Sequence, residues 1–241
     1  MRARIFVIIF LIIVSNLIVQ AQELQPKKIF EEQTKTHNAH ICFDGKYYYT
    51  AHGGIADEGV VNKIDKKGHI IESFALGLDM RSLLYDNSKK CFYVCTFNRN
   101  IYQINNLKKG NLILLHEQLY EDENTSLGIS RNGKYFYCTS SGFVFVYEVQ
   151  SGELVSSISN IQCGREANTG AVSIAVGNKC FYTLDSEQKT IFKYNLQGSE
   201  MGRYKYTDGD FSYSLSFANN YVFIAKDGNY NTGYWYGYKL K

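Results

Sequence analysis

A tight turn followed by an aromatic strand recurs five times along this chain at a nearly constant spacing. The pattern is clearest in Asn132-Gly133-Lys134-Tyr135-Phe136-Tyr137, and its equivalent positions Lys46, Lys90, Lys134, Lys179 and Asn220 lie 44, 44, 45 and 41 residues apart. Short apolar runs before and after each aromatic strand leave room for about four strands per period. Four strands per repeat of this length are typical of a β-propeller blade. The sequence therefore predicts an all-β, five-bladed β-propeller.

The composition agrees with many packed strands. The chain is 45% hydrophobic and 15% aromatic, with 20 Tyr and 15 Phe against a single Pro. Aromatic residues favour strands, and this much apolar material argues for a folded core and against a disordered chain. A helical bundle is excluded on the same grounds.

The two ends of the chain are expected to meet in the last blade. The fifth repeat stops at its third strand, while residues 27–32 near the N-terminus form an extra strand-like segment before the first repeat. Pairing this segment with the last repeat would close the ring and remove two open sheet edges. We expect one domain over residues 22–241, with repeats near 37–78, 79–122, 123–168, 169–209 and 210–241, and closing strand 27–32.

Residues 1–21 have the features of a secretory signal peptide. Arg2 and Arg4 precede an apolar run that ends near the small residue Ala21, where cleavage would fit. An uncleaved anchor is the alternative. Without this segment 24 basic residues stand against 23 acidic ones, a balance that argues against nucleic-acid binding. We expect a secreted or periplasmic protein, a monomer without a transmembrane segment after cleavage, whose six cysteines have an undetermined disulfide state.

One resemblance to known families rests on the third repeat. The stretch from Leu127 to Thr139, continued by Val144 to Leu154, is similar to the repeats of YVTN-type and quinoprotein-like propellers, in which a Ser-Pro-Asp-Gly-Lys turn precedes an aromatic strand. The chain lacks Pro in every such turn, and no Trp-Asp dipeptide marks a WD40-like repeat protein. The resemblance implies a fold and transfers no function.

Candidate site residues gather at the predicted entries to the inner strands. Aligning the repeats places His40 in register with Ser82, Ser126, Ser173 and Ser214. These side chains either satisfy backbone groups where the strands converge or line the channel mouth as a polar ring. The neighbouring loops add His37, His52, Asp79, Arg81, Glu123 and Asp210.

Two classes of function remain open on the sequence alone. His37, His40 and His52 belong to the first blade, so a metal or acid-base site of a lactonase-like or glycosidase-like hydrolase is geometrically possible. The last blade holds Asn229 and Trp235, the only Trp, in a Tyr- and Asn-rich segment that suits a sugar or a protein partner. No nucleophile elbow or phosphate loop is present. We therefore expect a binding module or scaffold for protein partners or glycans, with no cofactor and a metal-dependent hydrolase as the alternative.

Overall fold

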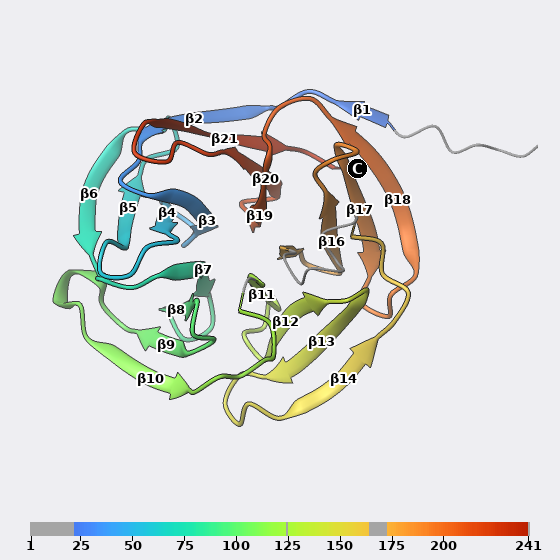
Figure 1. Cartoon of the computed structure of the whole chain (residues 1–241), viewed down its shortest axis with the longest axis horizontal. Coiled ribbons are helices and arrows are strands. Elements are labelled where there is room, and N and C mark those ends of the chain that lie inside the picture. The colour runs from blue at the N-terminus through green and yellow to red at the C-terminus, as the bar shows by residue number, and fades with distance from the viewer. Residues whose placement is uncertain (1–21, 124, 164–172, 241) are drawn as a thin grey trace, which may run out of the picture.

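Five small sheets stand around a central axis in the computed structural model, which describes residues 22–123, 125–163 and 173–240 (Figure 1). Each sheet has its first strand nearest the axis and its fourth at the rim. The predicted five-bladed β-propeller is therefore confirmed. The described residues contain no helix long and apolar enough to cross a membrane, and the predicted signal peptide lies outside them.

In the first four blades the four strands follow the chain from the axis outward, and these successive strands are antiparallel to one another. The first blade contains β3 (His37–Phe43), β4 (Tyr48–Gly53), β5 (Val60–Ile64) and β6 (Ile70–Ala75). The second contains β7 (Met80–Asp86), β8 (Cys91–Thr96), β9 (Ile101–Ile104) and β10 (Leu112–His116), with the short 3₁₀ helix η1 (Leu107–Lys109) before its last strand. The third contains β11 (Leu127–Ile129), β12 (Tyr135–Ser140), β13 (Phe143–Glu148) and β14 (Leu154–Ile158).

The last two blades each incorporate a strand from the N-terminus. The fourth blade contains β15 (Ile174–Val176), β16 (Cys180–Asp185), β17 (Thr190–Asn195) and β18 (Glu200–Tyr206), and β1 (Gln22–Leu24) adds a fifth strand. The fifth blade contains β19 (Phe211–Ala218), β20 (Tyr221–Lys226) and β21 (Thr232–Tyr238), with β2 (Lys28–Gln33) as its outer strand.

The closing strand is paired as the sequence predicts. β2 is antiparallel to β21 from Lys28 opposite Gly237 to Gln33 opposite Thr232, one residue later than the expected range 27–32. The pairing of β1 with β18 was not expected: it is parallel and only three residues long. A segment of three residues shows no periodicity, so the sequence gives no sign of it.

In the third and fifth blades the turns between the first two strands use Gly and Asn in the way the repeated sequence predicts. Asn219 and Asn220 have φ angles of 50° and 63°, and Gly133 has a φ of 68°. Two-residue hairpin turns need positive φ, which Asn and Gly adopt at low cost.

Aromatic side chains fill the spaces between blades. The apolar core is divided into five clusters, each drawn mainly from two neighbouring blades. Tyr93 on β8 and Phe136 on β12, for example, meet edge to face with ring centroids 5.3 Å apart. Because each sheet is covered on both faces by its neighbours, the second strands β4, β8 and β16 are buried along their whole length.

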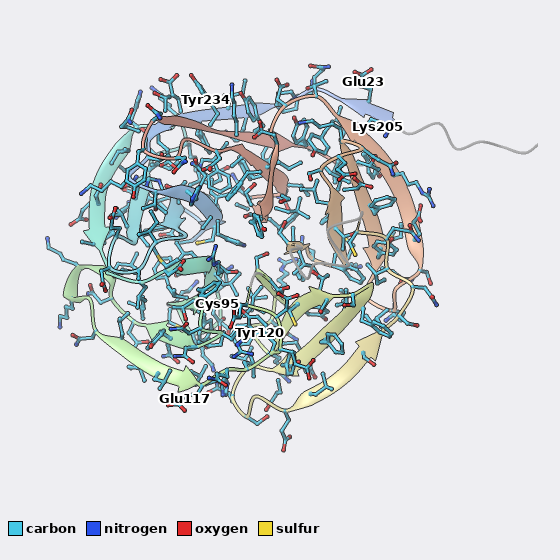
Figure 2. The ribbon with its side chains drawn as sticks, viewed as in Figure 1. Glu23, Cys95, Glu117, Tyr120, Lys205 and Tyr234 are labelled. Carbon is cyan, nitrogen blue, oxygen red and sulfur yellow. The ribbon has the colours of Figure 1, made fainter. Side chains whose placement is uncertain are left out.

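All six cysteines are free and buried. This includes Cys163, which lies in the connection after β14 and is only 2% exposed. Cys95 on β8 contacts the hydroxyl of Tyr120 from the connection between the second and third blades, inside the disc (Figure 2). By contrast, Glu23, Glu117, Lys205 and Tyr234 lie toward the rim (Figure 2).

Candidate functional site

The central channel opens on two different faces of the disc. We call the side with the loops leading into the inner strands, and with the loops between second and third strands, the entry face. The opposite side carries the inner hairpin turns and the turns between third and fourth strands, and we call it the hairpin face. The candidate residues that the sequence places at the entries to the inner strands and in the neighbouring loops belong to the entry face.

The aligned serines join neighbouring blades through the backbone. The hydroxyls of Ser82, Ser126 and Ser173 accept the amide N–H groups of Leu127, Ile174 and Leu215, each on the inner strand of the next blade. Between the fifth and first blades Ser216, rather than Ser214, accepts from Ile41. A break in the strand register between Phe211 and Ser216 accompanies this change. These hydroxyls therefore satisfy backbone groups where the inner strands converge, which is one of the two roles that the sequence analysis left open.

His40 occupies the equivalent position in the first blade and is buried, with only 2% of its surface exposed. It lies at the inner end of a channel pocket described below and faces the backbone of Leu83 on the second blade. Burial lowers the pKa of His40 to about 4, despite the opposing effect of the Leu83 backbone. The imidazole is therefore neutral at physiological pH and is not a surface ligand.

Replacing His40 should change how stability depends on pH. Between pH 6.5 and about 4 the unfolded chain binds a proton that folded His40 does not, so stability decreases as pH falls through this range. The expected loss from this group is about 3 kcal/mol. In His40→Gln, urea unfolding followed at pH 7 and pH 4.5 should show a smaller difference than in the parent protein. An unchanged difference would contradict the burial argument.

The buried carboxylate of Glu32 contacts His52 and Trp235, two residues that the sequence analysis expected at the surface. Its Oε1 accepts from the indole of Trp235 at 2.8 Å, and His52 Nε2 lies 3.0 Å from the same oxygen. Trp235 is 0% and His52 1% exposed. The expectation that they contact a ligand is corrected: Trp235 lies on the inward side of an alternating strand, and both serve the interface between the fifth and first blades.

Further polar groups complete the shell of Glu32. Thr50 donates to Oε2 at 2.7 Å, Asn62 to Oε2 at 3.3 Å and Asn38 to Oε1 at 3.2 Å. Burial raises the pKa of Glu32, but the hydrogen bond and charge of His52, with the bonds from Thr50 and Trp235, outweigh burial and lower it below its usual value. The carboxylate stays ionised inside the protein.

His37 remains accessible at the entry face. Its Nδ1 lies 2.6 Å from Oδ2 of Asp227, and the two side chains are 32% and 19% exposed. Oδ1 of Asp227 accepts from the backbone N–H of Asn38, and the ring of His37 stacks on Phe211 at 5.6 Å. This geometry fixes the imidazole and leaves Nε2 as the atom that can exchange a proton with a ligand. Asp227 was not among the expected site residues.

Asp79 and Arg81 lie beside this pair but are engaged with each other. Asp79 Oδ1 accepts from the backbone of Gly54 at 2.7 Å, and its Oδ2 lies 3.4 Å from Arg81, whose guanidinium covers the ring of Phe97. Glu123, Asp210 and Asn229 are exposed in separate loops. Within the described ranges no three His, Cys, Asp or Glu side chains come close enough to hold a metal ion. His37, His40 and His52 are thus not brought together as one site.

The pocket at the hairpin face was not predicted by the sequence analysis. A cavity of about 310 Å³ enters the channel between the inner hairpin turns, and all five blades line it. The last residue but one or the last of each inner strand contributes an equivalent side chain, namely Phe43, Tyr85, Ile129, Val176 and Phe217. Each of the five packs on the other side against the preceding blade. The signal was available, because these positions align two residues beyond the buried Ile41, Leu83, Leu127, Ile174 and Leu215.

Polar groups surround the mouth of this pocket. The amides of Asn87, Asn178 and Asn220 lie in the turns, with Ser130 and Arg131 between them. Asp44, on the neighbouring turn of the first blade, is fully used within its own loop: it accepts from the backbone of Lys46 and Tyr47 and from the hydroxyl of Tyr49. The mouth therefore combines partly exposed aromatic rings with amide and cationic groups.

Comparison with known proteins identifies the fold but no family. No protein-family model matches the chain, and no curated protein matches its sequence. Among solved structures 1188 chains match, so the architecture is too widespread to indicate one activity. One is the crystal structure of glutaminyl cyclase from Myxococcus xanthus, with a TM-score of 0.64 and 10% identity over 92% of this chain and 97% of that one. The likeness is one of fold.

Proposed function

We propose that this protein is an exported binding module that holds a carbohydrate in the channel pocket of the hairpin face. The single observation that carries the proposal is the 310 Å³ pocket, in which the aromatic residues Phe43, Tyr85 and Phe217 stand at equivalent positions beneath a rim of Asn side chains. Aromatic rings stack on the apolar faces of sugars, while amides bond to hydroxyl groups whose positions vary.

The size and shape of the pocket favour a small ligand or a chain end over a protein surface. Stable protein interfaces bury about 800 Å² on each partner, usually over broad and shallow surfaces. A cavity of a few hundred cubic ångströms instead matches one or two sugar rings. The predicted signal peptide would expose the protein to extracellular glycans, in agreement with this ligand class.

Removing the aromatic rings should weaken carbohydrate binding without unfolding the protein. Tyr85 and Phe217 are only partly buried, and each ring contributes about 0.5–1.5 kcal/mol to stacking. Binding to an immobilised glycan array should therefore fall about three- to tenfold in Tyr85→Ala and in Phe217→Ala. Tyr230→Ala is the matched control, since it removes an exposed aromatic ring from the entry face.

The same array decides between the pocket and the last blade. Loss of binding in Tyr230→Ala, with Tyr85→Ala and Phe217→Ala unaffected, would place the ligand on the Asn229–Gly233 loop and would refute the pocket assignment. Absence of any glycan ligand for the parent protein, together with capture of a protein partner, would refute the carbohydrate proposal itself.

A second candidate function is acid-base catalysis at the entry face, supported by the His37–Asp227 pair. The solved neighbour is described as a glutaminyl cyclase, and that reaction joins an N-terminal α-amine to its own side-chain amide with release of ammonia. His37 Nε2 could take the proton that the amine loses and pass it to the leaving nitrogen. Ammonia released from a peptide with N-terminal Gln, and lost in His37→Ala, would support catalysis; no release above the uncatalysed rate would eliminate it.

A further inference from the structure

Charge is divided unequally between the two faces of the disc. On the hairpin face the turns, together with residues 25–27 and 239–240, hold three acidic residues, Asp44, Asp65 and Glu153, and twelve basic ones: Lys27, Lys46, Lys66, Lys67, Lys89, Lys90, Lys108, Lys109, Arg131, Lys134, Lys179 and Lys239. The strand ends beside these turns add three acidic residues, Asp86, Glu148 and Glu200, and the basic residue Lys28. The described loops of the entry face hold three basic residues, Lys35, Arg99 and Lys189, against eleven acidic ones: Asp57, Glu58, Asp79, Glu117, Glu121, Asp122, Glu123, Glu187, Asp208, Asp210 and Asp227.

This division is invisible in the net charge of the whole chain, which is close to balanced. It follows from the topology, because turns that are far apart in sequence alternate between the two faces. A surface dominated by one sign of charge attracts ligands of the other sign and raises their local concentration.

The cations nearest the pocket are available to a ligand. Lys46, Lys89, Lys90, Arg131, Lys134 and Lys179 are all exposed, and none forms an ion pair with a carboxylate in the described part of the chain. Among the acidic residues beside them, Glu148 is partly exposed and lies near Lys134 and Lys89, whereas Asp44 and Asp86 bond within their own turns. Asp44 accepts hydrogen bonds from the backbone of its own turn. Asp86 is buried, and its Oδ1 accepts from the backbone N–H groups of Ser88 and Lys89.

We infer that the ligand of the channel pocket is an anionic polysaccharide, whose acidic groups lie along the basic residues of the inner hairpin turns while one sugar enters the pocket. The inference rests on the proposed carbohydrate site and specifies that the bound carbohydrate is negatively charged. Carboxylate-bearing and sulfated sugars share the chemistry that exposed lysines recognise. A lipid surface could also contact these lysines. A flat bilayer, however, would leave the pocket on the axis empty.

The test compares four probes: polygalacturonate, dextran sulfate, uncharged dextran and vesicles containing phosphatidylglycerol. Lys134→Gln/Lys179→Gln removes two charges from the hairpin face, and Lys35→Gln/Lys226→Gln removes two exposed charges away from it. Each lysine near an anionic surface typically strengthens binding several-fold at low salt. We therefore expect the first double variant to bind at least tenfold more weakly than the parent protein. The second should stay within about twofold of the parent.

The expected result is binding of an acidic polysaccharide that both Lys134→Gln/Lys179→Gln and Tyr85→Ala weaken, with dextran bound at least tenfold more weakly. A preference for dextran sulfate over polygalacturonate, or the reverse, identifies the acidic group and supports the inference in either case. Equal binding of dextran, lost in Tyr85→Ala, would overturn the inference and leave the carbohydrate site standing. Binding that is weakened by Lys134→Gln/Lys179→Gln, is unchanged in Tyr85→Ala and is equally strong for the vesicles would overturn both the inference and the proposed carbohydrate site.

Discussion

Substituting Glu32 with Ala should destabilise the protein by about 3–5 kcal/mol, the largest effect we expect of any single polar change. The carboxylate lies on the closing strand β2 and accepts from four side chains, with His52 as a further partner. Its removal leaves several donors buried without an acceptor, and each costs about 1–3 kcal/mol. Because one end of this network lies on the strand that closes the ring, the loss falls on the contact between the fifth and first blades.

Thermal unfolding and urea titration of Glu32→Ala and Glu32→Gln would measure this effect. The control is Glu31→Gln, which changes the charge of the next residue on the same strand, where the side chain is exposed. Glu31→Gln should lie within about 0.5 kcal/mol of the parent. A loss below about 1 kcal/mol in Glu32→Ala would show that the network contributes little.

Acid should weaken the same interface. The pKa of Glu32 is lower in the folded protein than in the unfolded chain, so its contribution is complete above the unfolded value of about 4.5 and disappears as pH falls through the folded value. The parent protein should lose stability steeply below pH 4.5, and Glu32→Gln should lose less over that interval. Urea midpoints measured at pH 5 and pH 3.5 would show the difference.

Gly53→Ala is the second change with a large expected effect. A methyl group at Gly53, at the end of β4, would lie 1.8 Å from the carbonyl oxygen of Met80 on the first strand of the next blade. A backbone atom cannot rotate away as a side chain can, so the first two blades would have to separate. We expect a loss of about 3 kcal/mol or more, at the upper end of what overpacking costs.

The control for Gly53→Ala is Gly202→Ala on the outer strand β18. There the nearest atom to the new methyl group would be the hydroxyl of Tyr204, at 3.3 Å, at the end of a side chain that can move. Circular dichroism melting curves of the two variants should therefore differ clearly. Equal melting temperatures would mean that the approach of Gly53 to Met80 is looser than the structure indicates.

The architecture could be predicted because its signals are local and repeated. Turn residues such as Asn219 and Asn220 favour a hairpin between two strand-like runs, and the aromatic strand after the turn recurs at each blade interface. The closing strand followed from counting strands, since a fifth blade with three needed a partner. None of these inferences required knowledge of a side chain's neighbours.

The burial of the candidate site residues could not be predicted from the sequence, because burial depends on contacts between distant segments. Trp235 and His52 face Glu32, a residue 203 positions from the former in the chain, and nothing in the local sequence indicates that contact. The local sequence likewise gives no sign that Gly53 lets two blades approach closely. His37 is accessible at the entry face, but its partner Asp227 lies 190 residues away, so the sequence alone does not indicate the pair.

The N-terminal segment from Gln22 to Gln33 has a consequence for how the protein reaches its native state. It pairs with β18 in the fourth blade and β21 in the fifth, and through Glu32 it contacts the first. During synthesis this segment is made before every other described strand, yet its partner strand β21 is made after all the others. The ring must therefore wait, open at one side, until nearly the whole chain is present, and a refolding step of high contact order should follow the assembly of the individual blades.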